Sequence, residues 1–231
     1  MSETDSFIEE VTEEVRRDRL FALMKRYGWI AVLAILLLVG GAAINEWRKA
    51  QARAEAEATG DAMIAALRSD DAGERAAALA ALSPESQGAR ALAALLAAGE
   101  QVEAGQTEQA AATFESVAGN ADLPLIYRQV ASYKRLAILG DTLSFDERRA
   151  GYEALVGPGS QLRLLAEEQL ALIDIETGDT ASAAGRLQAI ASDAAVTAGL
   201  RQRATQLMVA LGETPEAIPG AEGETGATAA E

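Results

Sequence analysis

One uncharged run of 19 residues, from position 27 to position 45, constrains this chain more than any other feature. The hydrocarbon core of a bilayer is about 30 Å thick and needs roughly 20 helical residues to cross it. The chain has two tryptophans, Trp29 and Trp47, which would lie roughly 27 Å apart along a helix. Amphipathic rings at that spacing suit the two interfaces of a membrane. The run therefore predicts a transmembrane helix at 27–45, with Tyr27, Trp29 and Trp47 as interface anchors.

A cleavable signal peptide is the main alternative, because Gly41, Ala42 and Ala43 provide small residues of the kind found at cleavage sites. Signal peptides begin with a short basic segment. Here 26 residues precede the uncharged run, and seven of them are acidic. The sequence therefore favours an uncleaved anchor, which joins an N-terminal arm at 1–26 to a body that begins at residue 46.

The distribution of lysine and arginine around a span sets its orientation, with the richer side in the cytoplasm. Five basic residues shortly precede the run, and three shortly follow it. The prediction is a single-pass protein with a cytoplasmic N-terminus and a C-terminal domain outside the cytoplasm, which is the periplasm in a bacterium. The topology determinants are Arg16, Arg17, Arg19, Lys25 and Arg26, opposed by Arg48, Lys49 and Arg53.

The residue inventory excludes most catalytic chemistry. The chain has no histidine and no cysteine, which removes catalytic triads, cysteine nucleophiles, imidazole or thiolate metal sites and disulfides. We therefore predict no enzyme activity, no catalytic or metal-binding residue and no cofactor. The net charge of −15 has the wrong sign for a nucleic-acid binder. Neighbouring acids, such as Glu167 with Glu168 or Asp174 with Glu176, are interpreted as a solvated helix face.

A repeat begins at about residue 88. Fifty-two of the 231 residues are alanine, the strongest helix former. Three glycines at the expected repeat turns, Gly105, Gly140 and Gly178, lie 35 and 38 residues apart. Helix pairs with a period near 34 residues are typical of tetratricopeptide solenoids. The expected packing residues of the second helices are Ala110, Phe114, Tyr152, Ala183 and Leu187.

These patterns predict an all-α chain in five segments. The cytoplasmic arm (1–26) and the transmembrane helix (27–45) are followed by connecting helices at 46–87 and a tetratricopeptide-like repeat domain at 88–211. Residues 212–231 carry five acids and no base, and we expect a disordered acidic tail. Ser144 and Glu147 have the spacing of a capping box, which predicts a helix start there.

The sequence resembles the tetratricopeptide-like ancillary subunit family of the SecYEG translocon, whose members are bacterial inner-membrane proteins with one N-terminal span and a periplasmic repeat domain. The similarity covers most of residues 5–211. It is carried by Lys25-Arg-Tyr-Gly-Trp29, by Glu46-Trp-Arg48, by the segment from Gly105 to Phe114, and by the segment from Leu170 to Asp179 with Ala183 and Leu187.

The resemblance implies two partners, the SecYEG translocon and a membrane-anchored periplasmic chaperone of the peptidyl-prolyl isomerase type. It also implies a function without catalysis, which is to help secreted proteins pass from the translocon to periplasmic chaperones. The alternative is a repeat scaffold of another envelope process, such as cell-wall synthesis, division or outer-membrane assembly. Self-association through the small residues Gly40, Gly41, Ala42 and Ala43 of the span also stays open.

Overall fold

A computed structural model describes residues 3–140 and 142–213, with backbone alone for 3–23 and 31. Its described residues form helices joined by short turns, without a strand, and the predicted all-α fold is confirmed. The chain divides into two compact units, Met1–Gly60 and Asp61–Glu231. The helices are α1 (Glu3–Ala66), α2 (Ala72–Ala80), α3 (Gln87–Glu103), α4 (Thr107–Ala118), α5 (Leu125–Leu139), α6 (Phe145–Glu153), α7 (Arg163–Glu176), α8 (Thr180–Ser192) and α9 (Ala198–Ala210).

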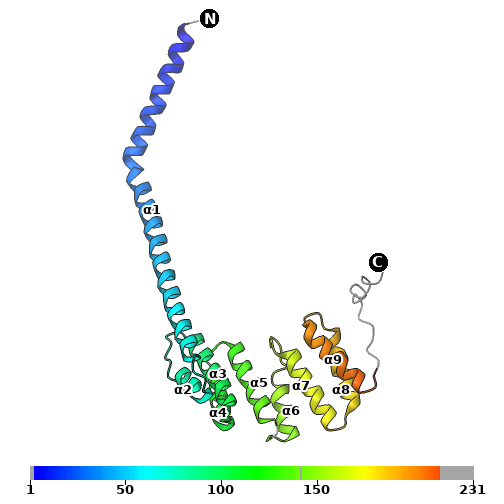
Figure 1. The fold of residues 1–231 in the computed structure, drawn as a ribbon. Helices are drawn as coiled ribbons and strands as arrows, with labels where there is room; N and C mark the ends of the chain where they lie inside the picture. The colour runs from blue at the N-terminus through cyan, green and yellow to red at the C-terminus, as the bar shows by residue number, and fades with distance from the viewer. Residues whose placement is uncertain (1–2, 141, 214–231) are drawn as a thin grey trace, which may run out of the picture. The chain divides into compact units, whose positions relative to one another are not determined.

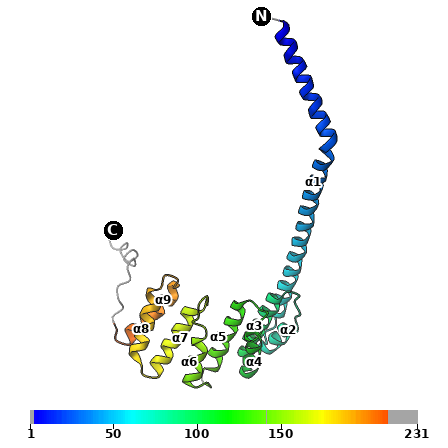
Figure 2. The ribbon, with the colours of Figure 1, turned by 180° about the vertical axis from the view of Figure 1, so that it is seen from behind.

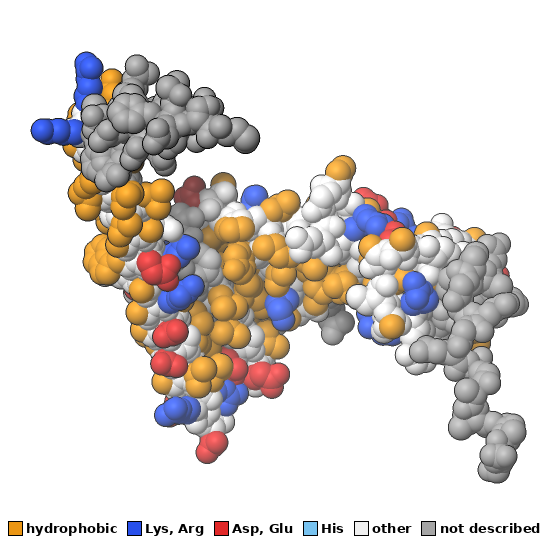
Figure 3. Space-filling view, turned by 90° about the horizontal axis from the view of Figure 1, so that it is seen from above, with side chains coloured by type: hydrophobic (Ala, Val, Ile, Leu, Met, Phe, Trp, Pro, Cys, Tyr) orange, Lys and Arg blue, Asp and Glu red, His pale blue; other side chains and the backbone are white. Residues whose placement is uncertain are grey.

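The first unit consists of most of helix α1, which continues without a break through the uncharged run. From Met24 onward this helix is long and apolar enough to cross a membrane, and none of its most apolar window is buried. Ile35, Leu37 and Leu38 expose 62%, 69% and 74% of their surface. Figure 3 shows hydrophobic side chains of this helix on the molecular surface. A continuous apolar surface of this size marks contact with lipid or with another protein.

The second unit consists of antiparallel helix pairs that follow one another along the chain. Helices α2 to α5 pack in succession, each on the next, and so do α6 to α9, while the contact between α5 and α6 is smaller. Figures 1 and 2 show these helices side by side in chain order from opposite directions. Because each pair mainly contacts its neighbours, the core is a chain of small clusters rather than one central mass.

Local sequence accounts for several helix starts. The hydroxyl of Ser144 accepts the backbone N–H of Glu147 at 3.3 Å, and the Glu147 carboxylate accepts the backbone N–H of Ser144 at 2.9 Å. The capping box predicted for these two residues is therefore confirmed. Asp71, Ser86, Asp179 and Thr197 cap other helices through their side chains.

The three turn glycines have different conformations. Gly105 and Gly178 have φ angles of +74° and +84°, in the left-handed region that favours glycine. Each is followed by a residue whose N–H bonds at 2.8 Å to a carbonyl of the preceding helix, so both helices end in the same Schellman turn. Gly140 ends α5 with a φ of −46°, which any residue adopts. The first and third pairs therefore share a turn that the middle pair lacks.

Alanine in place of Gly178 and alanine in place of Gly140 are expected to affect stability differently. Gly178→Ala places a Cβ in the left-handed region and should lower the free energy of unfolding by about 1 kcal/mol. Gly140→Ala meets only ordinary contacts, at 3.5 and 3.7 Å from backbone oxygens. It should leave stability unchanged or raise it by about 0.5 kcal/mol, because alanine reduces the entropy of the unfolded chain. Urea unfolding of the detergent-solubilised chain measures both variants. Equal losses in the free energy of unfolding would contradict the turn conformations assigned to the two glycines.

Candidate interaction surface

The predicted packing residues lie inside the repeat unit. Ala110 and Phe114 on α4 expose 0% and 1% of their surface, and Ala183 and Leu187 on α8 expose none. Tyr152 on α6 exposes 3%. Phe114 lies in a cluster with Ala91 and Ala98 of α3, Leu187 in one with Ala171 of α7, and Tyr152 in one with Leu136 of α5. Small residues let the helices approach, and the large side chains fill the space between them.

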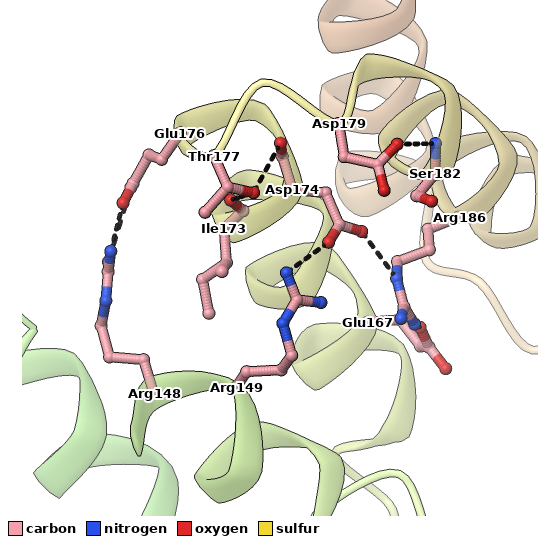
Figure 4. Close-up of polar contacts among 10 residues, drawn as sticks. All are labelled: Arg148, Arg149, Glu167, Ile173, Asp174, Glu176, Thr177, Asp179, Ser182 and Arg186. Carbon is pink, nitrogen blue, oxygen red and sulfur yellow. Dashed lines mark hydrogen bonds and ion pairs between the residues drawn. The ribbon is translucent and has the colours of Figure 1, made fainter. Parts of the chain in front are cut away.

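A buried carboxylate, Asp174, ties three consecutive helices together (Figure 4). Its side chain is 2% exposed. One oxygen lies 2.7 Å from Nη2 of Arg149 on α6, and the other accepts from Nε of Arg186 on α8 at 2.9 Å. A buried carboxylate is tolerated when opposite charges and hydrogen bonds compensate its lost hydration. Asp174 is thus a structural link between α6, α7 and α8.

Further bonds extend this network. Arg186 also reaches Glu167 at 2.6 Å, and Arg148 of α6 pairs with Glu176. Desolvation lowers the pKa of Arg186, but its bonds to Glu167 and Asp174 outweigh that effect and leave the pKa above its usual value. Figure 4 shows the guanidinium groups of α6 and α8 pointing toward the acids of α7. The network therefore fixes how α7 and α8 pack on α6.

A second buried acid, Glu168, joins α7 to α9. Both of its oxygens bond to the guanidinium of Arg203, at 2.7 and 2.8 Å. Burial, with the nearby charge of Glu168, raises the pKa of Tyr133 on α5. Burial, with the neighbouring Tyr133, also raises the pKa of Tyr152 to about 12. The two tyrosine rings meet edge to face, with centroids 5.7 Å apart. Tyr133, Glu168 and Arg203 thus bring polar groups of α5, α7 and α9 near one another.

These contacts correct one interpretation of the sequence. Glu168 and Asp174 are buried, at 6% and 2% exposure, and are not part of a solvated face. Glu167 is partly buried and Glu176 is exposed, and each is paired with an arginine. The sequence contained one sign of the pairing, which is the arginine pair Arg148-Arg149 at a position where the repeat pattern expects small residues. Among residues 24–30, 32–140 and 142–213, whose side chains the structure describes, no three acidic groups lie where they could hold a metal ion together.

The predicted membrane anchors have exposed side chains. Tyr27, Trp29 and Trp47 expose 49%, 64% and 66% of their surface. Lys25 and Arg26 are also exposed, and the Arg26 guanidinium lies 5.7 Å from the centroid of the Tyr27 ring. The side chains of Arg16, Arg17 and Arg19, and residues 214–231 of the predicted acidic tail, lie outside the described part of the chain. The orientation of the span stays a prediction.

Comparison with known protein families gives a match to a repeat domain. A family model described as a tetratricopeptide repeat-like domain matches residues 23–150, which is more than half of the chain. The match begins just before the apolar run and ends within α6. No curated protein and no solved structure matches the chain.

Proposed function

Because this chain belongs to the tetratricopeptide repeat-like family, we propose that it is a non-enzymatic protein-interaction module held at a membrane by its N-terminal helix. The observation that carries the proposal is the combination of two features in one chain. One is a set of stacked helix pairs, an arrangement that presents extended surfaces to peptides and partner helices. The other is an apolar helix whose side chains are uncovered. Anchoring raises the local concentration of the surface, so weak contacts suffice.

We further propose that the partners are the SecYEG translocon and a membrane-anchored chaperone of the peptidyl-prolyl isomerase type. Support comes from the resemblance in Lys25 to Trp29, in Glu46 to Arg48 and in the segment from Gly105 to Phe114. In this proposal the protein resides in a bacterial inner membrane and helps secreted chains move from the translocon to periplasmic chaperones. A scaffold for cell-wall synthesis, division or outer-membrane assembly is the second candidate, because the same topology serves such assemblies equally well.

The proposed topology predicts a protease pattern. Protease added to the periplasmic side of intact spheroplasts should digest the body from residue 46 onward and spare the first 26 residues. The physical reason is that five basic residues shortly precede the span and only three shortly follow it, which retains the arm in the cytoplasm. Antibodies against the two ends read the fragments. Protection of the body with loss of the arm would overturn the orientation.

Crosslinking in cells, followed by purification in mild detergent, tests the partners. A photo-crosslinking residue at an exposed position of α3, such as Arg90, should capture translocon or chaperone subunits. The matched control replaces residues 27–45 with leucines, which keeps the anchor and removes sequence-specific contacts in the membrane. Capture that survives this replacement assigns recognition to the helix pairs. Recovery of division or cell-wall enzymes instead would favour the second candidate.

A further inference from the structure

A groove of about 440 Å³ lies in the repeat unit between the walls formed by α4 and α6. Its floor is one face of α5, because residues spaced three and four apart on a helix share a face. The side chains that matter below are Leu125, Arg128, Gln129, Ser132, Leu136 and Leu155. The groove thus combines three leucines, two uncharged polar groups and a guanidinium.

The charges in the groove do not cancel. Arg135 also lines it, and its Nε lies 2.7 Å from a carboxylate oxygen of Glu115 across the groove. That pair is neutral. Arg128 makes no ion pair or hydrogen bond with any residue that the structure describes, and its Nε is buried. The groove therefore keeps one uncompensated positive charge within a body of net charge −13.

A buried guanidinium N–H without a partner is unfavourable, and a carboxylate is its best partner because two N–H groups can bond to two oxygens. Leu125 beside it exposes 48% of its surface, whereas Leu136 and Leu155 are buried, so Leu125 favours an apolar group on the same ligand. Gln129 and Ser132 can bond to peptide N–H and C=O groups. Inorganic phosphate would satisfy the charge but would bring no apolar group to the exposed side chain of Leu125.

We propose that this groove binds a peptide segment in which an acidic side chain stands beside a leucine-like side chain. The carboxylate bonds to Arg128, and the aliphatic group lies against Leu125 one helical turn earlier on α5. The inference rests on the proposed function as an interaction module and names the surface and the ligand chemistry. The acidity of the rest of the body repels acidic peptides, so recognition concentrates at this charge.

Calorimetric titration of the full chain in a non-ionic detergent tests the proposal with a defined probe. The probe is the capped peptide acetyl-Gly-Leu-Glu-Leu-Gly-amide, and its counterpart carries glutamine in place of glutamate. The glutamate peptide should bind about tenfold more tightly, a factor that corresponds to about 1.4 kcal/mol. Arg128→Gln should remove this preference. Lys134→Gln, an equal charge change at an exposed position of the same helix, should leave it intact.

A second variant covers the case in which Arg128→Gln fails to fold. Ser132→Leu fills the groove without changing its charge and should abolish binding of both peptides. Equal affinity for the two peptides, or an unchanged preference in Arg128→Gln, overturns the proposal. Displacement of the peptide by an equal concentration of inorganic phosphate also overturns it, in favour of a phosphate site. A negative titration leaves the protease and crosslinking results unaffected, so failure here is distinct from failure of the proposed function.

Discussion

Replacing Asp174 by asparagine is expected to lower the free energy of unfolding of the repeat unit by about 3 kcal/mol. The carboxylate is 2% exposed and holds Arg149 at 2.7 Å and Arg186 at 2.9 Å. An amide keeps the size of the side chain but presents an N–H group to one of the two cations. Both arginine side chains are 30% exposed, so water compensates part of the loss, and the effect lies at the low end for a broken buried pair.

Urea unfolding of the detergent-solubilised chain, followed by far-UV circular dichroism, measures this effect. Glu115→Gln is the control, because Glu115 pairs with one arginine and its side chain is 61% exposed. Exposed pairs contribute about 0.5 kcal/mol. Replacing Arg149 by methionine in the Asp174→Asn chain should recover part of the stability, because it removes a charge that has lost its partner, whereas Arg186 keeps its bond to Glu167. Similar losses in the two single variants would show that Asp174 does not tie the helices together.

Truncating Phe114 to alanine should lower the free energy of unfolding by about 4 kcal/mol. Phe114 is 1% exposed and fills the space between α3 and α4, where its neighbours Ala91, Ala98 and Ala110 are too small to close the cavity. Because each helix pair depends mainly on its neighbours, hydrogen exchange should increase first in α3 and α4 and last in α8 and α9.

Phe145→Ala is the matched control for this truncation. Phe145 begins α6, exposes 46% of its surface and lies 5.0 Å from the Arg148 guanidinium. Its loss removes one partly exposed cation–π contact and should cost about 1 kcal/mol. A uniform rise in exchange along all the helices of Phe114→Ala would instead indicate that the repeat unit unfolds as one cooperative body.

The local features of this chain followed from short stretches of sequence. A run of 19 uncharged residues demands an apolar environment whatever surrounds it. Ser144 and Glu147 form their capping box because both partners lie within one helical turn. The alternation of small and large residues around Ala110 and Phe114 predicted which faces of the second helices are buried, because helical period alone decides that.

The pairing of charges and the groove depended on contacts between residues far apart in sequence. Asp174 meets Arg186 on the next helix and Arg149 on an earlier one, and only the register of three packed helices brings them together. From their closeness in sequence, Asp174 and Glu176 were predicted to lie on an exposed acidic helix face, but Asp174 is buried. Gly140 stands at the repeat interval between Gly105 and Gly178, yet its φ is negative whereas theirs are positive. The chain therefore leaves α5 through a different turn.

By itself, then, the sequence determined an apolar N-terminal helix, an Ala-rich set of helix pairs and the absence of histidine and cysteine chemistry. These properties depend on composition and on periods shorter than one helix. Only the tertiary structure decided that Arg135 is neutralised by Glu115 whereas Arg128 is left uncompensated in a leucine-lined groove. The physical reason is that the interaction of two charges depends on their distance and on burial, and packing between helices sets both.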